Sequence, residues 1–412
     1  MNSTHKLLIL TFCLLGSACS NAFDSGRAWE ELITTLKSDY AYLDRLNSEF
    51  DSLDSQFRTK ALATTSKQEF IDVSQSFLRN FRDPHLNLGP MDKDDYIVYP
   101  TGSDIYAEVN GNTALVVDIK SGSDAFNNGL RTGMTIKEID GLNIHEAIEI
   151  VTGLSIEKLS LAQKNYALNI ALGGKRYQQR SLITATDEGQ NHYSLAASYD
   201  SINKLNDGPA ISFKDINGIG YIRFNNSLGN LETVTEFEEA IQALKKSRAF
   251  ILDLRNTPSG GNTGVAEPIL GYFTDTEKVY QCYQTQTPGH SYTEATLQKA
   301  IAKPQAFYID KPFVVLAGRW TGSMGEGMTI GLDALGAKAV IGSPMADLLG
   351  GIKKVELKQS GAWLELRFER LYHINGSFRE DFIPDTLLDA ADTNTQGKDP
   401  ALMTAIEILN KH

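Results

Sequence analysis

The sequence predicts an α/β protein in three consecutive parts: a helical N-terminal region, a small β-rich domain and a larger domain with a mostly parallel sheet. Apolar residues recur at helical spacing over residues 28–81. Short apolar strands alternate with Gly-containing turns over residues 104–146. From residue 211 onward, unbroken apolar strands alternate with helices, as expected of a buried parallel sheet.

The length of 412 residues agrees with two or three domains. We expect a signal peptide over residues 1–18, the helical region over 19–90, the β-rich domain with its flanking segments over 91–200, and the α/β domain over 201–412. The oligomeric state cannot be read from the sequence.

Composition excludes some classes of function. The formal net charge of −12 argues against binding to nucleic acid, which requires clustered Lys and Arg. The chain has three Cys and seven His residues, without metal-ligand spacings such as CxxC or HExxH. We therefore expect neither a metal nor another cofactor.

The N-terminus has the layout of an export signal. Lys6 precedes the apolar run 7–15, and the small residues 16–18 lead to Cys19. This arrangement resembles the lipobox of bacterial lipoproteins, although Gly16 stands where leucine is usual. The resemblance implies lipidation of Cys19 and anchoring at the periplasmic face of a bacterial membrane; a plain cleaved signal is the alternative. With Cys19 acylated, Cys282 is alone in the mature chain, so no intramolecular disulfide is expected.

The helical region is predicted to end at Asp83-Pro84, since proline disfavours helical backbone in the preceding residue. The next residue is His85. A histidine at the end of a helix is commonly structural, although such a residue can also act as a base.

The β-rich domain contains a strand at 114–117, the motif Gly129-Leu130-x-x-Gly133, a strand at 136–139 and an Asp-Gly turn. A helix over 159–172 and a strand over 181–186 follow. This order resembles a PDZ domain of the circularly permuted kind found in bacterial proteases. The resemblance implies that a peptide adds as a strand, with its carboxylate near the amides of Gly129, Leu130 and Gly133. A β-rich spacer is the alternative.

The α/β domain is expected to contain strands at 219–224, 250–254, 313–317 and 339–341, with helices at 233–246 and 325–335. After the second strand, Gly260 and Gly261 expose backbone N–H groups, as an oxyanion site requires. Ser323 lies between the third strand and a helix, where its hydroxyl could attack a carbonyl while the Met324 amide stabilises negative charge. Ser323 could equally be a simple helix N-cap.

Together these segments resemble the C-terminal-processing (tail-specific) serine peptidases, whose α/β domain is crotonase-like (ClpP-like). The matching motifs are Gly220-Tyr221-Ile222-Arg223, Asp253-Leu254-Arg255-Asn256 with Gly260-Gly261, Gly322-Ser323-x-x-Glu326, Gly336 with Val340-Ile341-Gly342, and Ile383-Pro384-Asp385. The resemblance implies that Ser323 is the nucleophile. It also implies that the amide of Met324 and that of Gly260 or Gly261 form the oxyanion hole.

One position departs from the Ser–Lys branch of this family: Leu348 stands at the place of the general-base lysine, and leucine cannot accept a proton. A second branch, resembling the tricorn core protease and retinoid-binding modules, takes a histidine from the N-terminal region and a carboxylate from the C-terminal region. That resemblance implies that His85 is the base and that Glu380 orients it, with Asp381 as the rival.

The sequence therefore predicts an exported Ser-His-Glu endopeptidase that acts on unfolded or C-terminally presented polypeptides. A non-catalytic binding protein for an apolar ligand or a peptide remains an alternative, because the retinoid-binding relatives use this fold to hold ligands. A hydrolase of small esters or amides is a third possibility.

Overall fold

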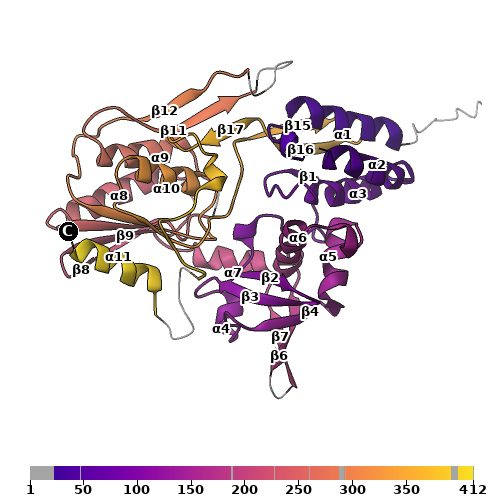
Figure 1. The fold of residues 1–412 in the computed structure, drawn as a ribbon, viewed down its shortest axis with the longest axis horizontal. Coiled ribbons are helices and arrows are strands. Elements are labelled where there is room, and N and C mark those ends of the chain that lie inside the picture. Colours follow the sequence, from indigo (N-terminus) through magenta and orange to yellow (C-terminus); the bar gives the residue numbers. More distant parts are fainter. Residues whose placement is uncertain are drawn as a thin grey trace, which may run out of the picture.

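A computed structural model describes residues 23–411, except 47, 187–188, 227, 259, 287–291, 293 and 391–397. Figure 1 shows the helical N-terminal region and the small β-rich domain beside the larger α/β domain. The predicted leader and Cys19 lie outside the described residues. Within the described part, no helix combines the length and the apolar character needed to cross a bilayer.

The N-terminal helices pack around an aromatic core. They are α1 (Ser25–Asp39), the 3-10 helix η1 (Leu43–Leu46), α2 (Glu49–Leu62) and α3 (Lys67–Arg79). Asp24 and Ser66 cap α1 and α3, each accepting a backbone N–H three residues ahead. Trp29 and Phe77, both fully buried, have ring centroids 5.0 Å apart and join α1 to α3.

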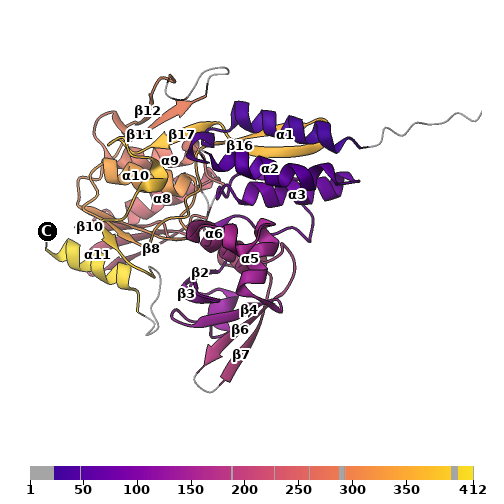
Figure 2. The same ribbon diagram turned by 45° about the vertical axis from the view of Figure 1, so that its right-hand side comes forward.

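A hairpin from the C-terminal half completes this region. Strand β1 (Asn87–Gly89) pairs antiparallel with β16 (Ala362–Arg367), which pairs with β15 (Ile352–Leu357). Figures 1 and 2 both show the two late strands beside the indigo helices. The hairpin belongs by sequence to the domain expected from residue 201 onward. Its apolar residues nevertheless share a core with the N-terminal helices.

The β-rich domain has a five-strand path with a short side strand, β5 (Leu142–Asn143), paired to β4. The strand order is β2-β3-β4-β6-β7. The path strands are β2 (Ile105–Asn110), β3 (Thr113–Ile119), β4 (Thr135–Ile139), β6 (Arg180–Thr186) and β7 (Gly189–Leu195). Its helices are α4 (Asp124–Asn127), α5 (Ile144–Thr152) and α6 (Leu161–Gly173). Reciprocal capping boxes begin both α5 and α6.

The α/β domain is built on a six-stranded sheet of order β18-β14-β13-β10-β9-β8. All neighbours are parallel except β8 and β9. The strands are β8 (Ile211–Ile216), β9 (Ile219–Phe224), β10 (Ala249–Asp253), β13 (Phe313–Ala317), β14 (Val340–Gly342) and β18 (Thr386–Leu387). The four predicted strands are thus confirmed to within one residue at each end.

Helices cover both faces of this sheet. Helices α8 (Glu232–Ala243), α9 (Thr263–Leu270) and α10 (Met324–Ala334) bury one face, and α11 (Pro400–Asn410) buries the other. Phe250 and Leu252 of β10 belong to the first core and Ile251 to the second, because successive strand residues point to opposite faces.

Two further segments complete the domain. Helix α7 (Ser198–Leu205) leads into it, and an outer antiparallel sheet has the order β12-β11-β17. These outer strands are β11 (Lys278–Thr285), β12 (Gln298–Ala302) and β17 (Glu369–Tyr372). Cys282 of β11 is a buried, free thiol.

Candidate active site

The site is built on two turns that follow the parallel strands β10 and β13. The Gly322 amide donates to the Thr257 carbonyl at 2.9 Å, and Thr257 and Thr321 form a parallel bridge. Both threonine hydroxyls donate to the Leu254 carbonyl, at 2.8 and 2.9 Å. Because the carboxyl ends of parallel strands meet at one edge, Ser323 is held beside the Gly260-Gly261 segment.

A buried ion-pair network stabilises the start of the turn that follows β10. The Arg255 guanidinium contacts both carboxylate oxygens of Asp253 and both of Asp399. The Tyr221 hydroxyl donates to Asp253 at 2.5 Å. Burial alone would raise the pKa of Asp253, but the Arg255 and Arg223 guanidiniums hold it well below its usual range. A fixed, ionised Asp253 therefore anchors the backbone that leads to Gly260.

Ser323 occupies a strained backbone position at the start of α10. Its φ is +53° and its ψ is −112°, a region that residues with a Cβ rarely adopt. Such strain costs on the order of 1–3 kcal/mol and persists only where surrounding structure imposes it. The side chain is half-buried. A serine held in this way at a helix N-terminus is well placed to act as a nucleophile.

The two groups predicted to form the oxyanion hole lie together. A Cβ built on Gly261 would come within 2.4 Å of the Met324 Cβ, so only glycine permits this approach. Among the described residues, no hydrogen bond uses the amide of Gly261 or Met324. Gly260 has a φ of +78°, also suited to glycine. The Gly261 and Met324 backbones thus lie close together next to Ser323, and neither amide has a hydrogen-bond acceptor among the described residues.

Glu326 is a site residue whose role the sequence motif left open. Its Oε2 accepts the Ser323 amide at 2.6 Å and the Leu348 amide at 3.1 Å, so one carboxyl joins the nucleophile turn to the 344–350 loop. The Arg379 guanidinium lies 3.7 Å from the same oxygen. Complete burial raises the pKa of Glu326 to about 8, against the lowering effect of Arg379. Burial therefore favours the protonated form of Glu326 in the folded protein.

This protonation gives a pH-dependent test. Between the ordinary pKa of 4.5 and the raised value of about 8, folded protein keeps a proton that unfolded chain loses. Stability should fall with rising pH in that window by about 1.4 kcal/mol per unit, and then level off. Glu326→Gln mimics the protonated form, so its stability relative to the parent should rise from pH 5 to pH 8 in urea unfolding.

An exposed carboxylate on β15 provides the control. Glu356→Gln removes the same charge at a solvent-exposed site and should show no comparable trend. A stability difference for Glu326→Gln that stays flat across the window would mean that Glu326 is ionised in the folded protein.

Leu348, which stands at the position of the family's lysine, packs against the turn that carries Ser323. Leu348 is fully buried, and its Cδ1 lies against Gly322, where an added Cβ would approach it to 2.6 Å. The nearby lysines belong to β15: Lys353 pairs with Asp39 at 2.7 Å, and Lys354 lies over the Trp363 ring. Neither replaces Leu348 at the site.

His85 reaches the other side of the same loop. The ring is 2% exposed, and Nδ1 lies 2.9 Å from the Leu349 carbonyl. A carbonyl can only accept, so Nδ1 carries a proton, and in the neutral ring Nε2 is then the acceptor. This is the tautomer of a general base. No hydrogen bond joins the His85 ring to the Ser323 hydroxyl among the described residues; the connection runs through Leu349, Leu348 and Glu326.

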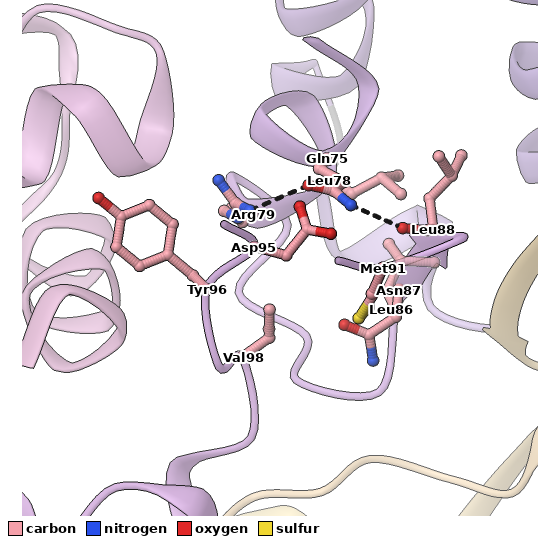
Figure 3. A pocket seen from close by; sticks show the side chains of 10 residues that line it. All are labelled: Gln75, Leu78, Arg79, Leu86, Asn87, Leu88, Met91, Asp95, Tyr96 and Val98. Carbon is pink, nitrogen blue, oxygen red and sulfur yellow. Dashed lines mark hydrogen bonds between the residues drawn. The ribbon is translucent and has the colours of Figure 1, made fainter. Parts of the chain in front are cut away.

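The segment around His85 is held on both sides. Before the ring, the His85 amide donates to Asp83 at 2.9 Å, and Asp83 pairs with the buried Arg367 of β16. After it, the Gln75 side-chain amide of α3 donates to the Leu88 carbonyl at 3.0 Å (Figure 3). The pocket drawn in Figure 3 holds about 10 Å³, room for no more than one water, and is therefore a packing gap.

Glu380 does not contact the His85 ring by any hydrogen bond of the described residues. Its Oε1 instead lies 2.9 Å from Arg45, and His85 Nδ1 is occupied by the Leu349 carbonyl. A backbone carbonyl thus takes the orienting place that the sequence assigned to Glu380 or Asp381. The physical reason is reach: η5 (Arg379–Asp381) points these carboxylates toward η1 and the 344–349 loop.

The predicted peptide-docking amides are also engaged elsewhere. Gly129, Leu130 and Gly133 donate to the carbonyls of Phe126, Ala125 and Val116 within the domain. A peptide carboxylate would therefore need other donors.

One of the two edges of this sheet is likewise occupied. The edge strands are β2 and β7, and α6 packs beside β2. The Ala107 amide donates to the Asn169 side chain at 2.9 Å and the Val109 amide to that of Asn165 at 2.8 Å. These are the donors that a strand added at β2 would need, so strand addition at that edge requires α6 to move.

Within the described residues, His, Cys, Asp and Glu side chains form no group of three suited to a metal ion. The arrangement is compatible with a serine hydrolase: a strained serine at a helix N-terminus, adjacent amide donors, and a histidine whose Nδ1 contacts the loop that also binds Glu326.

Comparisons with known proteins agree with this class. Residues 218–387, which make up most of the α/β domain, match the model of Peptidase family S41. No curated protein sequence matches the chain.

Three solved structures share the fold at low sequence identity. The photosystem II D1 C-terminal processing protease is 16% identical, with a TM-score of 0.57, over 89% of this chain and 93% of its own. Mature CPAF is 15% identical, with a TM-score of 0.63, over 94% and 96%. A candidate peptidase from Parabacteroides merdae is 15% identical, with a TM-score of 0.59, over 94% and 96%.

Proposed function

We propose that this protein is an exported serine endopeptidase that hydrolyses peptide bonds of unfolded or C-terminally presented polypeptides. The observation that carries the proposal is the strained Ser323 beside the amides of Gly261 and Met324, for which no hydrogen-bond acceptor is found among the described residues. Such donors stabilise the oxyanion that forms when a hydroxyl attacks a carbonyl. The match of residues 218–387 to a peptidase family supports a polypeptide as the substrate.

In this proposal His85 removes the Ser323 proton through Nε2 and returns it to the leaving amine. The Leu349 carbonyl holds the Nδ1 proton and so fixes the ring. The ring and the hydroxyl are not in hydrogen-bond contact in the free protein, and catalytic contacts of this kind commonly tighten only when substrate binds. A small movement of the 344–350 loop could change the distance between the two residues, since the loop contacts His85 directly and Ser323 through Glu326.

Labelling with a serine-reactive fluorophosphonate tests the nucleophile directly. The parent protein should be labelled at Ser323, and Ser323→Ala should lose the label while keeping its thermal unfolding transition. Ser55→Ala, an exposed site on α2, should be labelled like the parent. A folded parent that takes no label at Ser323 would favour the alternative of a non-catalytic binding protein.

Export and acylation of Cys19 remain proposals from the sequence, because the leader lies outside the described residues. If Cys19 is acylated, the enzyme is tethered to a bacterial membrane on its periplasmic face. Mass spectrometry of the protein from a membrane fraction would identify a lipidated Cys19 or a plain cleaved N-terminus.

A further inference from the structure

A cavity of about 540 Å³ lies where the three parts of the protein meet, beside the loop that joins His85 to the Ser323 turn. Two residues of the cavity wall adjoin His85: Pro84 precedes it in the chain, and the Leu349 carbonyl contacts its ring. Its size is within the range of pockets that bind ligands, and it exceeds what one side chain needs. The cavity is thus placed to receive part of a bound polypeptide.

Asp347 presents an uncompensated carboxyl to this cavity. Its φ is +55°, a strained value for a residue with a Cβ, and it directly precedes Leu348, whose amide binds Glu326. The residue is solvent-exposed where it lines the cavity. Among the described residues, no hydrogen bond or ion pair ends on its carboxyl. A strained position that directs an unpaired acid into a cavity suggests a ligand contact.

A second acid in the wall is only half satisfied. The Glu380 side chain is 4% exposed, and its Oε2 accepts no hydrogen bond within the described part of the chain. Its other oxygen pairs with Arg45. Buried carboxylate oxygens are normally bonded, so this one indicates a partner that arrives from the cavity.

Three arginines line the cavity: Arg82 is exposed, and the other two have partners within the protein. Arg45 pairs with Glu380 and lies 4.1 Å from the Phe378 ring centroid. Arg319 lies 3.7 Å from Asp118 and 3.8 Å from the centroid of the Tyr106 ring. Burial, followed by the charges of Glu380 and Asp381, raises the pKa of Asp347 to about 7 despite Arg319 and Arg379. An incoming cation would relieve this crowding of acids.

The rest of the wall suits the stem of a long basic side chain. Aromatic rings from the helical region, β2 and α6 line the cavity and offer faces to methylene groups and cations. They are Tyr40, Tyr42, Tyr106 and Tyr166. A metal ion is disfavoured, because the described acids do not form a metal-binding group of three.

We propose that Asp347 is a specificity-determining residue that receives a lysine or arginine side chain of the polypeptide substrate. This inference rests on the proposed function and deepens it. The cation would bind Asp347 directly and lie near Glu380, and the tyrosines would hold its stem. The preference should be for one basic residue at a fixed distance from the cut.

Digestion of a proteome-derived peptide mixture tests this preference without a known substrate. Mass spectrometry would give the residue frequencies around the cuts for the parent, Asp347→Asn and Asp310→Asn, an exposed acid of the α/β domain. We expect Lys and Arg to be enriched at one position for the parent and Asp310→Asn. Asp347→Asn should lose that enrichment, with kcat/KM for a lysine substrate about 10- to 100-fold lower and that for its norleucine analogue nearly unchanged.

Cleavage by the parent without basic enrichment, or enrichment that survives in Asp347→Asn, would overturn the inference while leaving the proposed function intact. Absence of any cleavage and of fluorophosphonate labelling would instead count against the proposed function.

A binding experiment tests the cavity independently of catalysis. N-acetyl-lysine methylamide and its norleucine analogue would be titrated by NMR into Ser323→Ala, with and without Asp347→Asn. The lysine compound should bind about tenfold more tightly, and only while Asp347 is present. Equal affinities for the two compounds in Ser323→Ala would refute the assignment of Asp347.

Discussion

Replacing His85 by glutamine is expected to lower kcat roughly 10⁴- to 10⁶-fold, close to the loss seen when a triad histidine is removed. Glutamine can still donate an amide N–H to the Leu349 carbonyl, so the buried segment should keep its place. It cannot accept the Ser323 proton at neutral pH. The measurement is the cleavage rate of an unfolded polypeptide under saturating conditions, with urea unfolding to establish that the variant is folded.

His145 provides a matched control. Its ring Nε2 also contacts a backbone carbonyl, that of Gly111, at 3.0 Å, but in the β-rich domain. His145→Gln should therefore leave kcat unchanged. If His85→Gln retained activity within tenfold of the parent, a different group would have to serve as the base.

Replacing Arg367 by methionine is expected to destabilise the protein by about 3–5 kcal/mol, because it leaves the Asp83 carboxylate buried without its cation. Asp83 also accepts the His85 amide and the Tyr40 hydroxyl, so the loss should extend to the position of the ring. Urea unfolding would give the free-energy change, and kcat should fall together with stability.

The double variant Asp83→Asn/Arg367→Met separates charge from packing. It removes both charges and keeps an acceptor for the His85 amide, so it should be more stable than Arg367→Met alone. A double variant as unstable as the sum of the two single variants would show that the pair contributes through shape rather than charge.

The strands and helices of the α/β domain were predictable because their signal is local. Unbroken apolar runs identified β9, β10, β13 and β14 within a residue, and the helix after Ser323 begins one residue before its expected start. The turn glycines were informative for the same reason, since Gly261 is required by a close approach to Met324.

Features that depend on distant pairing were not predictable. The pairing of β1 with β16 joins residues about 275 positions apart, and no hydrophobic periodicity in either segment indicates its partner. The orienting contact of His85 is a backbone carbonyl, which any residue at position 349 would supply. Asp347 gave no sequence signal either, because its strain and its lack of a partner arise only when three regions enclose the cavity.

The pairing of β1 with β16 also has a consequence for biosynthesis. The segment that carries His85 obtains its sheet partner and the Arg367 side chain only after residue 367 has left the ribosome. A nascent or truncated chain that ends between Ser323 and β16 contains both Ser323 and His85. It lacks the strand that holds the His85 segment in place. Under the proposed function, a chain that ends before residue 367 would lack the contacts that position its base.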